Sequence, residues 1–185
     1  MKVSIGLRSR FHAYDLAREL AKQGSLAMLY SGLPYYRAAQ FGVPKNHYQS
    51  ILVPEILARL AQKLPQPITT KMQPGLMMDQ LFDEWLARIL SDDIDVFLGW
   101  SGCCLSALKA ANQKGITSVV ERGSSHIEVQ RDLLFEEYER WGLPHLTFPQ
   151  KVIERELAGY EEAQYISIPS HFAMQSFLEK GIPKE

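Results

Sequence analysis

The chain has 185 residues and a formal net charge of -1, with 46% apolar and 22% charged residues. This length fits one domain, and the composition excludes extensive disorder because enough apolar surface can be buried to offset the entropy of ordering. The balanced charge argues against a nucleic-acid partner, since proteins that bind nucleic acid carry a basic excess.

Cysteines and N-terminal features narrow the class further. Cys103 and Cys104 are adjacent, so neither a disulfide framework nor a zinc-ligand spacing is present, and both are expected to be small buried side chains. The N-terminal apolar run is too short for a signal peptide, and no run approaches the roughly 18 apolar residues of a membrane span. We therefore expect a cytoplasmic protein. No motif in the sequence demands a metal or a cofactor, so we expect neither.

The first half of the chain alternates short apolar runs with longer amphipathic ones. Strand, helix and strand within about 30 residues form a βαβ unit with parallel strands. The expected strands are Lys2–Gly6, Ser25–Tyr30 and a weak one at Gln49–Val53. The expected helices are Phe11–Gln23, Glu55–Leu64 and Leu76–Leu90, with a loop or short helical pieces over 31–45.

The second half continues the alternation. The expected strands are Asp95–Trp100, Thr117–Glu121 and Tyr165–Pro169. The expected helices are Cys103–Lys114, Asp132–Arg140, Pro149–Ala163 and His171–Lys180, the last with Ser170 as its N-cap. Together these elements predict a Rossmann-like, doubly wound α/β domain that spans residues 1–185 with a mainly parallel sheet of about six strands.

Common nucleotide and hydrolase motifs are missing. The sequence GLRSRF follows the first strand in place of GxGxxG, and GxxxxGK[ST] does not occur. Neither GxSxG nor HExxH is present. The domain by itself is therefore not expected to be an NAD-binding module, a P-loop protein or a hydrolase.

Candidate site residues follow from the rule that ligands of open α/β sheets bind beyond the carboxyl ends of the strands. After the first strand, Arg8 and His12 lie at a helix start, where free N–H groups favour anions; the alternative is two solvated side chains. The candidates after later strands are Trp100, Ser101, Arg122, Ser124, Ser125 and His126. For these, the structural alternatives are a packed aromatic, an ion pair of Arg122 or Glu121 with a neighbour, and a satisfied loop histidine that caps a backbone carbonyl.

The segment 55–72 has an apolar face next to basic residues. An interfacial membrane helix has this pattern, and so has an ordinary packed helix, which we favour here. A peripheral position at the inner membrane face is the open alternative.

Three segments resemble the N-terminal half of GT-B glycosyltransferases of the retaining family 4 kind. They are KVSIG…HAYDLARELAKQG, DVFLGWSGCCLSALKAANQKGITSVVERGSSH and KVIERELAGYEEAQYISIPSHFAMQSFLEKGIP. The last segment, with Pro169-Ser170 followed by Phe172, Phe177 and Gly181, is the most specific. The resemblance covers nearly the whole chain and is clearest after Asp95.

The resemblance implies one half of a GT-B fold, the acceptor side, with the C-terminal donor-binding domain absent from this chain. It places His126 where the family's N-terminal histidine reaches the donor sugar, as the catalytic residue. It also places the Gly6–Arg8 loop near the donor phosphates, where the family often has a glycine pair and this chain has only Gly6. The implied partners are a nucleotide-sugar, as co-substrate, and a hydroxyl acceptor (a saccharide, lipid or other small molecule).

Two further functions stay open. The chain could be a non-catalytic binding subunit that docks on a separate donor-domain chain. An exposed apolar face near Pro169–Gly181 would support this function. It could also be a free-standing small-molecule binder of flavodoxin-like topology. For the isolated chain we expect no useful turnover, because half of the transition-state contacts are absent.

Overall fold

The computed structural model describes residues 1–61, 73–144 and 148–184. Within these residues six strands form one parallel sheet in the order β3-β2-β1-β4-β5-β6. The strands are β1 (Val3–Leu7), β2 (Leu26–Ser31), β3 (Tyr48–Ser50), β4 (Val96–Trp100), β5 (Thr117–Glu121) and β6 (Tyr165–Ser167). This is the Rossmann strand order, so the predicted fold is confirmed and the flavodoxin-like order is wrong.

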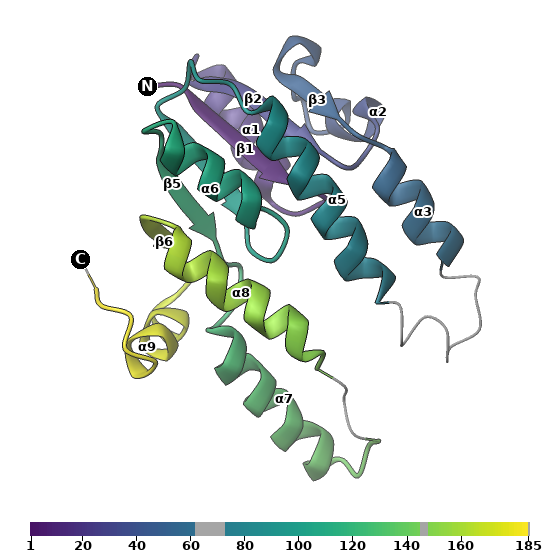
Figure 1. Cartoon of the computed structure of the whole chain (residues 1–185), viewed down its shortest axis with the longest axis vertical. Helices are drawn as coiled ribbons and strands as arrows, with labels where there is room; N and C mark the ends of the chain where they lie inside the picture. Colours follow the sequence, from purple (N-terminus) through teal and green to yellow (C-terminus); the bar gives the residue numbers. More distant parts are fainter. Residues whose placement is uncertain (62–72, 145–147, 185) are drawn as a thin grey trace.

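Helices cover both faces of the sheet. Figure 1 shows α5, α6 and α8 in front of the sheet and α1 behind it. The helices are α1 (Ala13–Lys22), α2 (Tyr35–Ala39), α3 (Val53–Ala61), α5 (Pro74–Ile89), α6 (Leu105–Gln113), α7 (Ile127–Arg140), α8 (Gln150–Glu162) and α9 (His171–Glu179), with a 3-10 turn, η1, at Lys45–His47. This three-layer arrangement explains why the central strands are apolar on both sides.

The centre of the sheet packs tightly against the helices in front of it. All five residues of β1 are buried, and Gly6 lies opposite Gly99 of β4 in the parallel register. A Cβ at Gly6 would lie 2.5 Å from Cδ2 of Leu86, and one at Gly99 would lie 2.7 Å from Cβ of Cys104. These two glycines therefore let α5 and the N-terminus of α6 approach the strands closely.

Several helix starts differ from expectation, and two of them have a clear local cause. The helix predicted from Cys103 begins at Leu105, because Gly102 adopts a φ of +79° and turns the chain first. The helix predicted from Asp132 begins at Ile127, directly after its N-cap His126. The predicted N-cap Ser170 is confirmed, since its hydroxyl accepts the N–H of Ala173 at 3.2 Å.

The helix α3 packs against α5, as the expectation of an ordinary packed helix requires, but three of its apolar residues are exposed. Ile56, Leu57 and Leu60 are 54%, 42% and 55% exposed. The helix contacts α5, but its own apolar row faces outward. The remainder of the predicted segment, residues 62–72, lies outside the described residues. In the described part of the chain, no helix combines the length and the apolar character that crossing a membrane needs.

Candidate functional site

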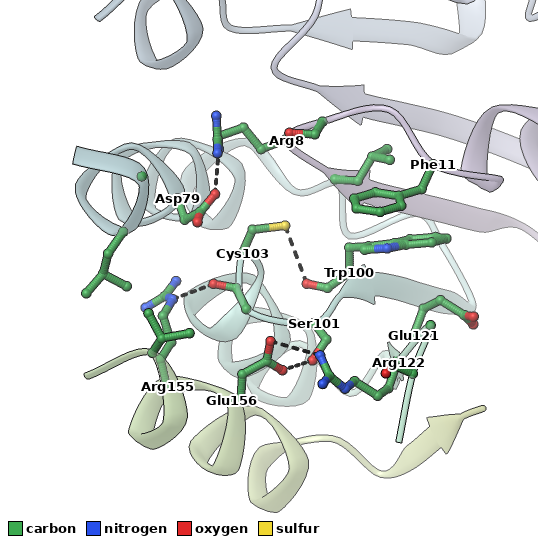
Figure 2. A pocket seen from close by; sticks show the side chains of 18 of the residues that line it. Arg8, Phe11, Asp79, Trp100, Ser101, Cys103, Glu121, Arg122, Arg155 and Glu156 are labelled. Atoms are coloured by element: carbon green, nitrogen blue, oxygen red, sulfur yellow. Dashed lines mark hydrogen bonds and ion pairs between the residues drawn. The ribbon is translucent and has the colours of Figure 1, made fainter. Parts of the chain in front are cut away.

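A hollow of about 620 Å³ opens at the carboxyl edge of β1, β4 and β5, and we call it the edge cavity (Figure 2). It sits beside the β1–β4 junction, where the strand order changes direction and ligands bind in folds of this kind. Its lining residues are Leu7, Arg8, Ser9, Phe11, His12, Gly75, Leu76, Asp79, Trp100, Ser101, Gly102, Cys103, Glu121, Arg122, Gly123, Ser124, Gln130, Val152, Arg155 and Glu156.

Arg122 anchors one side of the edge cavity. The residue is 8% exposed, and its guanidinium donates to the carbonyl of Ser125 at 3.0 Å, to Oε1 of Glu156 at 3.2 Å and to Oε1 of Gln130 at 2.5 Å. The other carboxylate oxygen of Glu156 accepts the hydroxyl of Ser101. A buried ion pair needs such additional hydrogen bonds to offset its desolvation. The Arg122 side chain is therefore held rigidly by α7 and α8.

A second buried ion pair joins α5 to α8. Asp83 is fully buried and accepts the backbone N–H groups of Ser106 and Ala107, at 2.7 and 2.9 Å, at the start of α6. Arg155 pairs with Asp83 and donates from Nε to the carbonyl of Gly102 at 2.7 Å. The carboxylate therefore both caps α6 and fixes the arginine that lines the edge cavity.

Arg8 forms an ion pair with a carboxylate in the wall of the edge cavity. Its Nε lies 2.5 Å from Oδ1 of Asp79 on α5, and both side chains are largely buried. Burial raises the pKa of Asp79, and this effect outweighs the lowering by the Arg8 charge. The pair places an arginine at the wall where the resemblance predicts donor phosphates. Contact between Arg8 and a phosphate stays a prediction.

Aromatic rings form the wall between β1 and β4. Figure 2 shows the ring of Phe11 over the indole of Trp100, with the ring centroids 5.7 Å apart and the planes within 17° of each other. The imidazole of His12 meets the same indole edge-on at 4.7 Å. Its Nε2 lies 3.3 Å from Oε1 of Glu121, the last residue of β5. A histidine, a carboxylate and an aromatic surface thus share one wall.

Six of the nine residues predicted for the site line the edge cavity. They are Arg8, His12, Trp100, Ser101, Arg122 and Ser124. The loops that the strand-end rule selects therefore meet at one cavity, and ligand binding by these residues stays a prediction. The prediction that Glu121 and Arg122 pair with neighbours is also confirmed, with His12 and Glu156 as those neighbours.

Two further predicted residues, Gly6 and Ser125, do not line the edge cavity. Gly6 is inside β1, where its missing side chain leaves room for Leu86 and Phe97. Ser125 is 6% exposed, and its carbonyl accepts the Nε–H of Arg122. Both residues thus support the wall from behind.

His126 is not a lining residue either. It is 2% exposed, and its ring packs against those of Tyr160 and Phe177, at centroid distances of 5.2 and 5.1 Å. Its Nδ1 accepts the backbone N–H of Glu128 at 3.3 Å. The backbone N–H of His126 donates to Oγ of Ser176 at 2.8 Å. Burial lowers the pKa of this histidine. The geometry agrees with the structural alternative in that the histidine is a satisfied cap, but it caps an N–H group and not the expected carbonyl. A catalytic role stays a prediction.

Sequence reasoning missed several lining residues, most of which come from helices. Phe11 precedes α1, Asp79 lies on α5, Gln130 on α7, and Arg155 and Glu156 on α8. One signal was available for Glu156. It lies three residues after Ile153 and four before Tyr160, and a charged residue on such an inward face indicates a buried ion pair.

Cys103 and Cys104 are buried free thiols, as predicted. Cys104 donates to the carbonyl of Gly6 at 3.2 Å, and burial raises the pKa of its thiol. Cys103 lines the edge cavity. Across the residues that the structure describes, no group of three or more histidine, cysteine, aspartate or glutamate side chains is arranged to hold a metal ion.

Comparison with known proteins identifies the fold but no family. No family model matches the chain, and no curated protein is similar to it in sequence. The chain aligns over 99% of its length with UDP-GlcNAc 2-epimerase from Methanocaldococcus jannaschii, with a TM-score of 0.58 and 10% identity. A UGT transferase from Siraitia grosvenorii in complex with UDP aligns over 97% of the chain, with a TM-score of 0.47 and 13% identity.

The chain spans 43% of the epimerase chain and 48% of the transferase chain, so less than half of either. At this identity the likeness to the epimerase concerns the fold alone. It confirms, together with the strand order, that the chain is a Rossmann-like α/β domain of the kind that forms one half of a GT-B-like structure.

Proposed function

We propose that this chain is the acceptor-side half of an enzyme that moves a sugar from a nucleotide-sugar to a hydroxyl acceptor. The observation that carries the proposal is the edge cavity, where charged, hydroxyl and aromatic side chains converge at the ligand edge of this domain. The epimerase and the transferase that share its arrangement are named for UDP-sugar substrates or bound UDP, which supports a nucleotide-sugar.

In this proposal a donor-binding domain closes over the edge cavity and supplies the remaining contacts. The support is that each structural neighbour is about twice as long as the aligned part. Arg8, paired with Asp79, would meet the phosphates, while Trp100, Ser101 and Ser124 would line the acceptor side. The resemblance to retaining family 4 adds the expectation that the anomeric configuration is kept, which the stereochemistry of the product measures.

The test is a release assay for the nucleoside diphosphate, with a panel of UDP-sugars and hydroxyl acceptors. One sample holds the 185-residue chain alone. The other holds the same chain together with a donor-binding domain, which is taken either from its own gene or from a candidate partner. We expect acceptor-dependent release only from the combination. Fast turnover by the chain alone would contradict the division into halves. A change in the sugar without any acceptor would indicate epimerisation.

The alternative of a non-catalytic binding subunit has one observation in its favour. Near the C-terminal helix α9, Phe172 is 63% exposed and Tyr165 is 52% exposed. A second hollow of about 390 Å³ is lined by Tyr165, Met174, Phe177 and Ile182, among other residues. Light scattering of the chain mixed with candidate donor-domain chains separates this function from the first, because only docking without turnover supports it.

We also propose that the exposed apolar row of α3 rests on a membrane surface in the cell. Ile56, Leu57 and Leu60 give this helix the outward apolar face that an interfacial helix needs. Cosedimentation with anionic vesicles tests the proposal, and a triple change of these residues to Gln should abolish it. Equal sedimentation of both proteins would contradict it.

A further inference from the structure

An exposed aromatic ring lines the edge cavity. Phe11 is 54% exposed, and one face of its ring lies against the indole of Trp100, with the two planes within 17° of each other (Figure 2). Because Trp100 covers one face of the ring, the exposed area of Phe11 lies on the other face and at the ring edge. We call this exposed ring face the Phe11 platform.

The support under the platform is fixed. Trp100 is 5% exposed, ends β4 and is paired with Glu121 of β5 in the sheet. The imidazole of His12 meets the same indole edge-on, with the ring centroids 4.7 Å apart. A ring that rests on an immobile indole loses little conformational freedom when a ligand packs on it, so the platform is pre-organised for binding.

The surroundings of the platform are polar. Six of the residues that line the edge cavity are arginines, aspartates or glutamates: Arg8, Asp79, Glu121, Arg122, Arg155 and Glu156. The hydroxyls of Ser9 and Ser124 also line the edge cavity, and within the described residues neither has a hydrogen-bond partner. An apolar ligand would take water from these groups without replacing its hydrogen bonds, which is costly, whereas a ligand with several hydroxyls can replace them.

A pyranose ring fits this division of the wall. It has an apolar C–H face, which can pack on an aromatic ring, and a rim of hydroxyls that both donate and accept hydrogen bonds. The volume of about 620 Å³ is also in the range of about 300–1,000 Å³ that is usual for small-molecule sites. One apolar surface among many polar groups therefore favours a saccharide over a lipid or another apolar acceptor.

We infer that the acceptor is a saccharide whose ring packs on the Phe11 platform, with Ser9 and Ser124 as hydrogen-bond partners of its hydroxyls. The inference rests on the proposed function and names the class of its acceptor. Phe11 is then a residue that determines acceptor specificity. A nucleobase also stacks on aromatic rings, so the test includes a nucleoside.

The first test is an NMR titration of the 185-residue chain with labelled phenylalanine and tryptophan rings. The probes are the methyl glycosides of glucose, galactose and mannose, together with cyclohexanol and uridine. We expect at least one glycoside at millimolar concentration to shift the Phe11 and Trp100 signals, with Trp141 unchanged and cyclohexanol much less effective. Equal shifts by cyclohexanol, shifts by uridine alone, or no shift by any glycoside would overturn the inference.

Variants of Phe11 make the titration specific. Phe11→Ala should weaken the affinity for the glycoside about 3- to 10-fold, and Phe11→Tyr, which keeps the ring, should stay within about 2-fold of the parent. The matched control is Trp141→Ala, which removes another exposed aromatic and should leave the affinity unchanged. If urea denaturation shows that Phe11→Ala is unfolded, Phe11→Leu replaces it, because leucine keeps apolar bulk without a flat ring. Unchanged affinity in the folded variant would contradict the inference.

The second test measures transfer by the chain combined with its donor-binding domain. Phe11→Ala should raise the KM of the saccharide acceptor by the same factor as it weakens binding, with the KM of the UDP-sugar unchanged. A rise in the KM of the UDP-sugar alone would mean that the platform holds the nucleotide, and would overturn the inference.

Two further outcomes separate the inference from the proposed function. A preference for a long-chain alcohol over every saccharide tested would overturn the acceptor class and leave the proposed function standing. Absence of transfer by every combination would end the proposed function, while the glycoside titration would still decide whether the Phe11 platform binds a sugar.

Discussion

Two histidines follow carboxyl ends of strands in the same sheet, and both are N-cap residues. His12, after β1, leaves its helix uncapped by its side chain and is more than half exposed beside Glu121. His126, after β5, uses Nδ1 to cap α7 and is 2% exposed among aromatic rings. The difference teaches that a position at the carboxyl edge of the sheet does not by itself place a side chain in the lining of the edge cavity. The ring that is not occupied with backbone hydrogen bonds is the one that faces the cavity.

The largest effect is expected for His126→Ala. The change removes a buried ring between Tyr160 and Phe177 and the N-cap acceptor of α7, so the free energy of unfolding should fall by about 3 kcal/mol. Urea denaturation measures it. His12→Ala, the matched change at the other histidine, should shift the free energy of unfolding by less than about 0.5 kcal/mol.

This pair of variants can break the comparison. If His126→Ala unfolds at the same urea concentration as the parent but abolishes transfer, His126 is catalytic, as the family resemblance implies, and its burial misleads. If both variants are equally destabilised, the two regions do not differ in the way that their exposure indicates.

Much of the fold was predictable because apolar periodicity reports on burial. Thr117–Glu121 is a strand with the predicted bounds, and the other five differ by one to three residues at their ends. Helix starts were less predictable, because the turn at Gly102 and the cap by His126 depend on tertiary contacts as well as propensity. Strand ends also identified the loops of the edge cavity.

The direction of each side chain at the candidate site could not be predicted from the sequence. The loop after β5 contains both Ser124, which lines the edge cavity, and Ser125, which is buried behind it. Adjacent residues in a loop point in different directions that only the packing against α8 and α9 determines. The lining residues from α5 and α8 were missed because no local pattern relates them to the strand ends.

A smaller loss of stability is expected for Ser176→Ala. The Oγ of Ser176 accepts the N–H of His126 at 2.8 Å and donates to the carbonyl of Ala173 at 2.6 Å, and it is buried. Its removal leaves one buried N–H group without this acceptor, which costs about 1–2 kcal/mol. Chemical denaturation should show this loss with transfer unaffected. A stability equal to that of the parent would mean that water replaces the hydroxyl and that the His126 region is less enclosed than described.

Stability should also depend on pH through His126. Its pKa is lowered mainly by burial, with Lys180 and Arg122 adding to the effect and Glu128 opposing it. The unfolded chain therefore binds a proton at a higher pH than the folded chain, so stability is lost as pH falls below about 6.5. His126→Asn keeps an N-cap acceptor and cannot titrate.

The measurement is the free energy of unfolding of both proteins between pH 8 and pH 5. The difference between them should be constant above about pH 7.5 and should move against the parent protein below about pH 6.5. Taking the difference cancels other titrating groups, such as Asp79. Parallel curves would show that His126 titrates alike in both states, and the environment of the two histidines would then differ less than their exposure indicates.

The smallest effect is expected for Lys180→Gln, which tests what sets the environment of His126. Lys180 pairs with Glu128 at 3.0 Å, and both side chains are about one-third exposed. Water and salt screen such a pair, so the free energy of unfolding should change by less than about 0.5 kcal/mol, and less still at high salt. Thermal melts at low and high salt measure this. A salt-sensitive loss above 1 kcal/mol would mean that charge, and not the Tyr160 and Phe177 rings, holds this histidine away from the edge cavity. A small loss leaves burial as the cause, which is the property that His12 lacks.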